Sequence, residues 1–443
     1  MQISRSILSA LCLLALATGC RESATLPLEA GTGADPVLPK PVSGLIPTMD
    51  IAPAVGWLAG EMPTPAAGMS VTAFSTNLDH PRWLLVLPNG DVLVAESNAP
   101  VRPDDGKGIK AMVAKAVMKR AGAGVPSANR ISLLRDADGD GVAEFRSAFA
   151  ENLNSPFGMA LVDGNFYVAN TDGIVHFAYR DGMTQLEGAG TKLAELPAGP
   201  INHHWTKSLI ASPDGSRLYA TVGSNSNVGE NGMDKEFQRA AILEIDRATG
   251  TSRVFASGLR NPNGMDWEPR SGKLWTAVNE RDELGSDLVP DYMTSVQDGA
   301  FYGWPYSYYG QNVDSRVEPP KPDLVAKAVA PDYALGAHVA PLGLVFSRAA
   351  ALLPPRYAEG VFIGQHGSWN RRPPSGYRVV FVPFSNGQPS GPVQEVLVGF
   401  LDAKGNARGR PVGVAIDRGG ALLVADDVGN AIWRVASAPA LAR

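Results

Sequence analysis

Cysteine is nearly absent from this chain, whose 443 residues include only Cys12 and Cys20. A mature protein that begins at Cys20 retains one cysteine, which excludes an internal disulfide. The sequence also lacks an excess of basic residues. Its formal net charge is −5, so a nucleic-acid partner is not expected. Beyond the first twenty residues no stretch is long and apolar enough to predict a membrane-spanning helix.

Three common catalytic motifs are also missing. No Gly-x-Gly-x-x-Gly follows a strand, no nucleophile elbow is present, and no His-Glu-x-x-His zinc motif occurs. If the protein is a redox enzyme, its cofactor is therefore not held by a dinucleotide-binding fold.

The N-terminus has the features of an export signal. Arg5 provides a positive start, Ile7 to Ala17 form a short apolar core, and Ala17-Thr-Gly-Cys20 follows. Small residues directly before a cysteine predict a lipoprotein signal peptide over 1–19, with Cys20 as the lipidated first residue in the bacterial periplasm. An ordinary signal peptide, cut at a nearby small residue, is the alternative. Residues 20–69 are rich in Pro, Gly, Ala and Thr and predict a flexible tether.

A strand–turn–strand pattern recurs six times along the rest of the chain. Its turn glycines are Gly90, Gly164, Gly215, Gly272, Gly360 and Gly419. A recurrence of roughly 50 to 90 residues is too long for a helical solenoid and suits the blades of a β-propeller with loop insertions. The sequence therefore predicts an all-β fold, a six-bladed β-propeller over 70–437, with insertions near 98–130 and 306–337.

Two charged segments interrupt this pattern. Lys107 to Arg120 is basic and Ala-rich, which is compatible with a helix and with either a solvated insertion or a binding patch. Asp136-Ala-Asp-Gly-Asp-Gly141 resembles the start of a calcium loop. Its twelfth position is Ser147 rather than a bidentate Glu, so both an acidic hairpin turn and a structural Ca²⁺ site remain open.

Polar residues recur at equivalent places in the repeats. Those just before the first strands are Arg82, Asn154, His204, Asn261, His338 and Arg410. Those at the ends of the second strands are Glu96, Asn170, Asn225, Glu280, His366, and Asp426 or Asp427. Because the two strands of each repeat are antiparallel, both sets share one side. If the first strand is innermost, they meet at one mouth of the central channel.

Two neighbouring repeats contain the most closely spaced candidate catalytic residues. Asn202-His203-His204-Trp205 precedes one first strand, and Gly258-Leu-Arg-Asn-Pro-Asn-Gly264 precedes the next. A His with a pKa near neutrality can remove a proton from a hydroxyl. A neighbouring guanidinium can stabilise charge that develops on an oxygen.

In these segments the chain resembles the glucose/sorbosone dehydrogenase family, which are six-bladed propellers that use pyrroloquinoline quinone (PQQ) with Ca²⁺. The resemblance covers about residues 70–435. Within the family, the chain is most similar to the sorbosone and pyranose dehydrogenase branch. It is carried by the two segments above together with Asn279–Asp287, Tyr302–Pro305, Gln365–Asn370 and Gly409–Gly413.

The resemblance implies roles for individual residues. His204 matches the general base, Arg260 and Asn261 match an Arg-Asn-Pro element at the quinone, and Arg410 matches an Arg that meets the cofactor's carboxylates. Arg82 and His366 resemble cofactor-binding residues of the pyranose branch. Asn279–Asp287 corresponds to a segment whose carbonyls hold Ca²⁺. The candidate metal carboxylates in and after this segment are Glu280, Asp282, Asp287 and Asp291. Of these, the resemblance implies that Asp287 and Asp291 could serve a second, structural ion.

Two positions depart from the glucose enzymes. Gly223-Ser224 stands where those enzymes have Gly-Asp, so an acidic partner for the base is absent or supplied elsewhere. Leu153-Asn154 replaces Gln-Asn. These departures bear on glucose specificity more than on the cofactor.

The implied function is the oxidation of an aldose, sorbosone or similar sugar by hydride transfer to the quinone. His204 would act as base, and the electrons would pass to an unidentified periplasmic acceptor. One alternative is a metal-dependent lactonase-type propeller that uses Glu96, Glu280 and Asp426. Another is a non-catalytic propeller that binds a partner on its rim.

Overall fold

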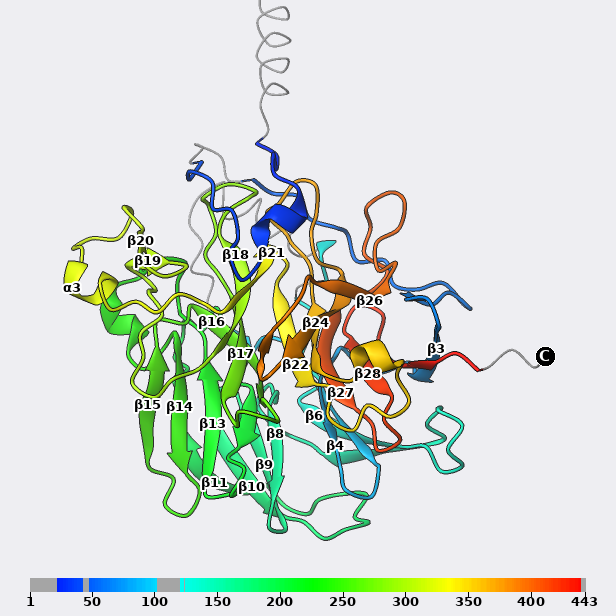
Figure 1. The fold of residues 1–443 in the computed structure, drawn as a ribbon. Helices are drawn as coiled ribbons and strands as arrows, with labels where there is room; N and C mark the ends of the chain where they lie inside the picture. The colour runs from blue at the N-terminus through cyan, green and yellow to red at the C-terminus, as the bar shows by residue number, and fades with distance from the viewer. Residues whose placement is uncertain (1–21, 43–47, 102–119, 123, 440–443) are drawn as a thin grey trace, which may run out of the picture.

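Six small antiparallel sheets form a ring in the computed structural model, which describes residues 22–42, 48–101, 120–122 and 124–439 (Figure 1). This confirms the predicted six-bladed β-propeller. In each of the first three blades the strands follow one another from the channel outward. They are β4 (Pro81–Val86), β5 (Val92–Glu96), β6 (Arg130–Arg135) and β7 (Phe145–Ala150); β8 (Met159–Val162), β9 (Asn165–Asn170), β10 (Gly173–Ala178) and β11 (Thr191–Glu195); and β12 (Leu209–Ala211), β13 (Arg217–Val222), β14 (Ala241–Asp246) and β15 (Ser252–Ser257).

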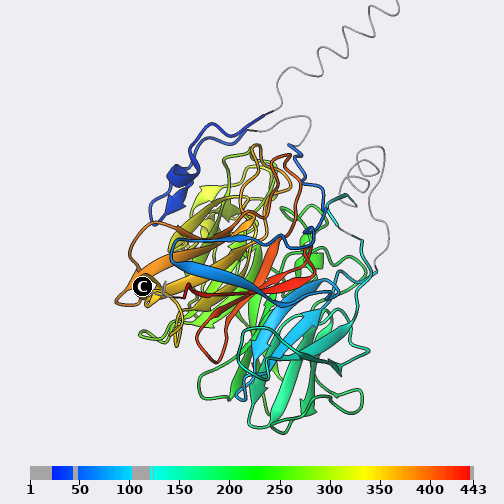
Figure 2. The same cartoon turned by 90° about the vertical axis from the view of Figure 1, so that its right-hand side faces the viewer.

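Each of the last three blades is extended or completed by a strand from the N-terminal part of the chain. Their own strands are β16 (Asn261–Trp267), β17 (Leu274–Asn279), β18 (Pro290–Ser295) and β21 (Tyr333–Ala337); β22 (Pro341–Phe346), β23 (Gly360–Gln365), β24 (Arg378–Ser385) and β26 (Gln394–Val398); and β27 (Pro411–Ile416), β28 (Leu422–Asp426) and β29 (Ala431–Ser437). The sixth blade is completed by β3 (Met69–Ser75), which pairs with β29 from Ser75↔Ile432 to Met69↔Ser437. The ring is thus closed by an N-terminal strand, which lies in blue beside the red C-terminal strands (Figure 2).

The core lies between the blades. Strands such as β23 and β28 are buried along their whole length, because the blades on either side cover both faces of each sheet. Continuous apolar runs such as Leu422-Leu-Val-Ala425 are the sequence counterpart of this packing. No helix within the described residues has the length and hydropathy that a membrane crossing requires.

The six innermost strands contact one another around the channel axis. Three of them contain Pro-x-Gly and a fourth, β8, directly follows one; each glycine leaves room for the backbone of the next inner strand. A Cβ would lie 2.5 Å from Leu342 O at Gly264, and 2.4 Å from Val412 O at Gly343. At Gly413 it would lie 2.7 Å from Arg82 O, and at Gly158 2.2 Å from the Leu209 nitrogen. These glycines therefore set the close approach of neighbouring blades.

The turn glycines predicted from the repeat need two corrections. Gly90, Gly164, Gly215 and Gly272 have positive φ angles, as tight turns require. Gly360, however, is the first residue of β23. It stands there because a Cβ would lie 2.2 Å from Phe381 Cζ. In the last repeat the residue with positive φ is Gly420 rather than Gly419.

The segment predicted as a flexible tether, 20–69, is not an extended linker where it is described. Its strand β1 (Thr32–Gly33) pairs with β21, and β2 (Thr64–Pro65) pairs with β26. Met69 already belongs to β3. These contacts use mainly backbone groups, so they need no apolar periodicity in the sequence. The predicted signal peptide and Cys20 lie outside the described residues.

The two predicted insertions lie between strands of blades one and four. In the first, between β5 and β6, residues 102–119 and with them nearly all of the predicted helix lie outside the described residues. The second runs over 296–332 rather than 306–337, because β21 is the fourth strand of its blade. It contains β19 (Ser307–Tyr308), β20 (Asn312–Val313) and the short helix α3 (Pro322–Val325).

Candidate active site

The predicted rim residues share one end of the propeller. Strand pairing places Pro81 opposite Glu96 and Pro411 opposite Asp426. The same pairing places Asn261 opposite Asn279. The starts of the inner strands and the ends of the second strands therefore lie together, which confirms the arrangement predicted from the repeats. We call this end the mouth.

His204 lies at the mouth in the loop before β12, and Ser224 fixes its orientation. Its Nδ1 is 2.7 Å from the main-chain oxygen of Ser224 and 3.1 Å from Ser224 Oγ. Because Ser224 Oγ donates its own hydrogen to Ser226 O at 2.7 Å, both oxygens can accept from Nδ1–H. This network assigns the proton to Nδ1 and leaves Nε2 as an acceptor. The main-chain carbonyl of Ser224 thus orients His204, for which the sequence offers no acidic partner at this position.

The charge state of His204 follows from its surroundings. Burial lowers its pKa well below 6.5, and the positive charge of Arg260 lowers it further. The imidazole is therefore neutral at neutral pH. Its neighbour Asn261 has a buried Oδ1 with no hydrogen-bond partner within the described residues. Gly223 allows Asn261 and His204 to lie close to the backbone at this point, because a Cβ at position 223 would lie 2.3 Å from Asn261 Oδ1 and 2.5 Å from His204 Cβ.

Arg260 is buried and its donors are occupied by neighbouring loops. Nη1 donates to Glu280 O at 2.5 Å, and Nη2 donates to Asn227 Oδ1 at 3.0 Å and to Asp282 Oδ2 at 2.9 Å. Asp282 also accepts from Asn370 Nδ2 at 2.7 Å. The guanidinium therefore holds a fixed position beside His204, in an ion pair that the sequence did not reveal.

A second charged cluster lies across the mouth and is centred on Asp427. Arg82 Nη1 donates to Asp427 Oδ2, and His366 Nε2 lies 2.9 Å from the same oxygen. His80 Nε2 lies 3.6 Å away. Burial works against the ionised carboxylate, but His366, His80 and Arg82 outweigh it and lower its pKa. The sequence placed Asp427 only as an alternative to Asp426 and did not single out His80, although His80 lies two residues from Arg82.

Asp426 has a structural role next to this cluster. Its Oδ2 accepts from Trp57 Nε1 at 2.7 Å and from Trp433 Nε1 at 3.0 Å. Burial raises its pKa to about 6. The Arg410 backbone nitrogen donates to its Oδ1 at 2.8 Å. Asp426 therefore anchors the strand end, while its neighbour Asp427 contacts Arg82, His366 and His80.

Arg410 is the second arginine on this side of the mouth. Its guanidinium lies 5.2 Å from the centre of the Tyr377 ring. Its Nη2 donates to Ala52 O at 3.3 Å, so the N-terminal segment contributes to the wall. Arg410 Nε and Arg82 Nε are buried without a hydrogen-bond partner among the described residues.

The four predicted metal carboxylates do not converge on one point. Glu280 Oε2 accepts from Arg281 Nε at 3.1 Å, whereas its Oε1 is buried and without a partner in the described part of the chain. Asp282 pairs with Arg260, as above. Asp287 Oδ2 accepts from the backbone of Thr25 at 2.6 Å. The remaining member, Asp291, lies in β18.

Asp291 is a buried carboxyl that joins two loops at the mouth. Its Oδ1 accepts from the Glu280 nitrogen at 2.7 Å, and its Oδ2 accepts from the Ala340 nitrogen at 2.8 Å. Burial raises its pKa to about 8. It therefore connects the end of the second strand in blade four to the start of blade five.

Among the described residues, one group of at least three His, Cys, Asp or Glu side chains has its ligand atoms within 4.8 Å of one another: Asp136, Asp138, Asp140 and Glu144. This group forms the turn between β6 and β7, at the end opposite the mouth. Its carboxylates accept from backbone nitrogens, such as that of Gly139 on Asp136 Oδ1 at 2.7 Å and that of Ala137 on Glu144 Oε2 at 2.8 Å. Glu144, rather than Ser147, completes the acidic turn.

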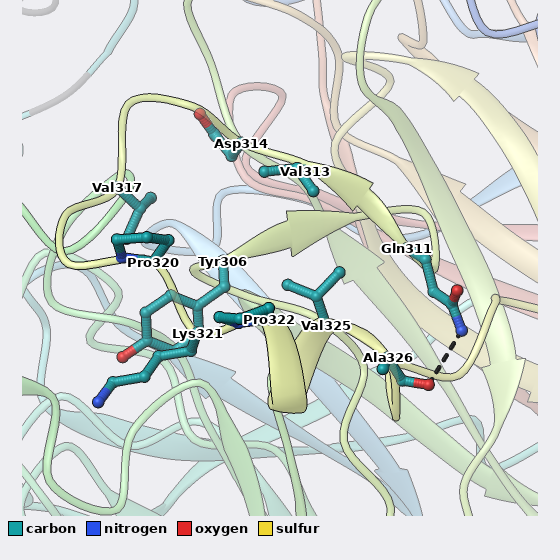
Figure 3. A pocket seen from close by; sticks show the side chains of 10 residues that line it. All are labelled: Tyr306, Gln311, Val313, Asp314, Val317, Pro320, Lys321, Pro322, Val325 and Ala326. Carbon is teal, nitrogen blue, oxygen red and sulfur yellow. Dashed lines mark hydrogen bonds between the residues drawn. The ribbon is translucent and has the colours of Figure 1, made fainter.

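The insertion of blade four forms a wall beside Arg260. Arg281 fastens it through Pro305 O at 2.9 Å and Asp314 Oδ2 at 3.0 Å, while Trp304 Nε1 donates to Asn227 O at 2.8 Å. The outer side of the insertion holds a pocket of about 450 Å³. Figure 3 shows this pocket, with the Tyr306 ring and α3 among its walls.

The fold and the mouth together define a six-bladed propeller with a buried, polar and charged site at one end of its channel. Residues 323–438 match the sequence profile described as TrAA12-like, and residues 164–367 match Glucose / Sorbosone dehydrogenase. An uncharacterised protein of Borreliella burgdorferi is 30% identical over 296 residues, covering 65% of this chain and 76% of that protein. The chain belongs to the glucose/sorbosone dehydrogenase family.

Two further relatives come from the fungus Coprinopsis cinerea. A pyrroloquinoline quinone-dependent pyranose dehydrogenase is 25% identical over 224 residues, which are 41% of this chain and only 30% of the length of that relative. The holo form of the PQQ domain of the pyranose dehydrogenase superposes with a TM-score of 0.67 at 20% identity, covering 87% of this chain and 100% of that domain. At this identity the superposition shows a shared fold.

Proposed function

We propose that the protein is a PQQ-dependent sugar dehydrogenase that also uses Ca²⁺. The observation that carries the proposal is the set of buried polar atoms at the mouth that lack a partner within the described residues: Asn261 Oδ1, Arg82 Nε, Arg410 Nε and Asp427 Oδ1. Buried polar groups are rarely left unpaired, so these atoms point to a polar ligand. The names of the Coprinopsis relatives supply its identity.

The charges at the mouth fit an acidic quinone. Arg82 and Arg410 would hold carboxylates of PQQ, with His366 beside them, because guanidinium groups pair well with carboxylates. Asn261 would meet the quinone from the opposite side, next to His204. When bound, PQQ would supply the acceptor for the hydride that leaves the substrate carbon.

His204 is suited to act as the general base. With Nδ1–H held by Ser224, its neutral Nε2 would accept the proton of a substrate hydroxyl or aldehyde hydrate. Burial and Arg260 keep this nitrogen unprotonated at neutral pH. Arg260, held by Asp282, would keep positive charge where an oxygen becomes more negative.

For Ca²⁺, Glu280 fits best among the predicted carboxylates. Its Oε1 is the one carboxylate oxygen of the four that is buried and unpaired within the described residues, and hard cations prefer such ligands. Asp287 fits less well, because its Oδ2 already accepts from Thr25 and Leu26.

The proposal is tested by reconstitution. Purified protein is loaded with PQQ and Ca²⁺, and dye reduction is followed with aldoses and sorbosone. We expect His204→Ala to reduce kcat by about 10²- to 10⁴-fold while the affinity for PQQ changes by less than about threefold. His176→Asn is the matched control, because His176 lies in β10 against Tyr167. Absence of both quinone binding and quinone-dependent turnover contradicts the proposal.

We further propose that Cys20 carries a lipid and holds the enzyme in the periplasm, where a separate acceptor collects its electrons. The support is the sequence Ala17-Thr-Gly-Cys20 after an apolar core. Mass spectrometry of the N-terminal peptide tests it: a diacylglyceryl-modified Cys20 is expected, and an unmodified N-terminus generated by cleavage elsewhere contradicts it.

A further inference from the structure

The N-terminal segment is fastened to the rim of the mouth from its first described residue. Glu22 Oε1 accepts from the Ser286 nitrogen at 2.8 Å, and its Oε2 accepts from Ser286 Oγ at 2.6 Å and from Thr48 Oγ1 at 2.8 Å. Ser286 belongs to the loop that follows β17 at the mouth. These bonds outweigh partial burial and lower the pKa of Glu22, so the carboxylate is ionised and held.

Asp287 provides the second attachment point. Its Oδ2 accepts from the Thr25 nitrogen at 2.6 Å, from Thr25 Oγ1 at 3.1 Å and from the Leu26 nitrogen at 3.0 Å. The Ala24 nitrogen donates to Arg372 O at 2.7 Å. The backbone nitrogens of three consecutive residues, from Ala24 to Leu26, are thus tied to loops of blades four and five, which restrains this part of the chain.

The same segment then follows the rim. Val42 donates its N–H to Leu284 O at 2.9 Å, the Asp50 nitrogen donates to Trp369 O at 2.9 Å, and Ala52 O accepts from Arg410. We call residues 22–42 and 48–57 the strap. Figure 1 shows its first part in blue across the upper end of the propeller, beside β18 and β21. The chain therefore enters the folded domain at the mouth.

This entry point sits very close to the candidate lipid anchor. Cys20 lies outside the described residues, but it precedes Glu22 by two residues, which allows a reach of only about 7 Å. Even the apolar segment that ends at Ala17 is five residues from Glu22, or at most about 18 Å. Val42, whose nitrogen donates to Leu284 O beside this entry point, is 53% exposed and adds apolar surface there.

We propose that the mouth of the propeller faces a lipid bilayer and is held there by the strap. The inference rests on the proposed anchor at Cys20, and it replaces a long tether with a short, fixed connection. A protein attached through 50 flexible residues would rotate freely above the membrane. One pinned at Glu22 and Asp287 presents the His204 side of the ring to the lipid surface and its β12–β13 and β16–β17 turns to the solvent.

Energy transfer to the membrane tests this orientation. If Cys20 is lipidated, an introduced cysteine is the sole free thiol. Asp234→Cys, at an exposed position of η2 (Met233–Glu236) at the mouth, and Lys273→Cys, in the exposed β16–β17 turn, each receive a donor dye. The two proteins are then reconstituted into liposomes that contain acceptor-labelled lipid. We expect at least twofold higher transfer from position 234 than from position 273.

Three outcomes overturn the proposal: equal transfer from both positions, higher transfer from position 273, and failure of the protein to attach to liposomes. A Ser286→Ala/Asp287→Asn variant tests the strap itself. It should stay attached but lose the difference between the two labels, and a difference that persists would show that the strap does not set the orientation. Dye-linked sugar oxidation in detergent is measured in parallel, so failure of the orientation is distinguished from failure of the proposed function.

Discussion

Gly223→Ala is a small change with a large expected effect on the site. The new methyl group would lie 2.3 Å from Asn261 Oδ1 and 2.5 Å from His204 Cβ, whereas ordinary contacts begin near 3.4 Å. Both side chains would have to retreat by about 1 Å, which a buried site does not permit without loss. Misplacement of a catalytic group by about 1 Å can cost about 10²-fold. We therefore expect kcat/KM to fall about 100-fold, which corresponds to about 2.7 kcal/mol.

The assay compares quinone-loaded variants in dye reduction and in urea unfolding. Overpacking should also lower the free energy of unfolding by about 1 to 3 kcal/mol, too little to unfold a domain of this size. Gly31→Ala is the control, because no atom lies within 4 Å of its added Cβ and its φ is not positive. If Gly223→Ala keeps kcat/KM within threefold of the wild type, His204 is not the base or Asn261 is not at the reacting centre.

Three other predictions follow from the same contacts. Ser224→Ala should cost less than about tenfold in kcat, because the carbonyl that orients His204 remains; a loss like that of His204→Ala would contradict this. If His204 is the base, as proposed, the acidic limb of the kcat/KM–pH profile should lie below pH 6.5, because burial and Arg260 lower the pKa of His204 and keep it unprotonated until that lower pH is reached; a limb centred at or above 6.5 would contradict this prediction. Asp427→Asn should lower the unfolding free energy by about 3 to 5 kcal/mol, because it breaks a buried ion pair with Arg82. Denaturant titration measures this change, and a loss below about 1 kcal/mol would contradict the prediction.

The sequence revealed the blades because each repeat is local. A strand, a glycine turn and a second strand form within about twenty residues, and their rim residues then share one end by geometry alone. A second local signal, Pro-x-Gly at the inner strands, recurs four times and marks the glycines that contact the next blade. It could have placed the innermost strand without the structure.

What the sequence did not reveal depends on partners far apart in the chain. The sequence predicts that an acidic partner of His204 is absent or supplied elsewhere, but it does not identify the main-chain oxygen of Ser224 that takes its place, because no residue type encodes that oxygen. The ion pair of Arg260 with Asp282 requires two blade loops to be placed first. The composition of the strap predicts a tether because its contacts are made by backbone groups and by Glu22 and Asp287, which produce no apolar periodicity.

Because β3 pairs with β29, the propeller cannot close until the chain has been made as far as β29. β3 is synthesised long before its partner, and the sixth blade has no outer strand until β29 has been made and Ser437 can pair with Met69. A chain that stops before β29 exposes the unpaired edges of both β3 and β28, which invite aggregation and proteolysis. The ring can therefore close only after the polypeptide has been synthesised as far as β29.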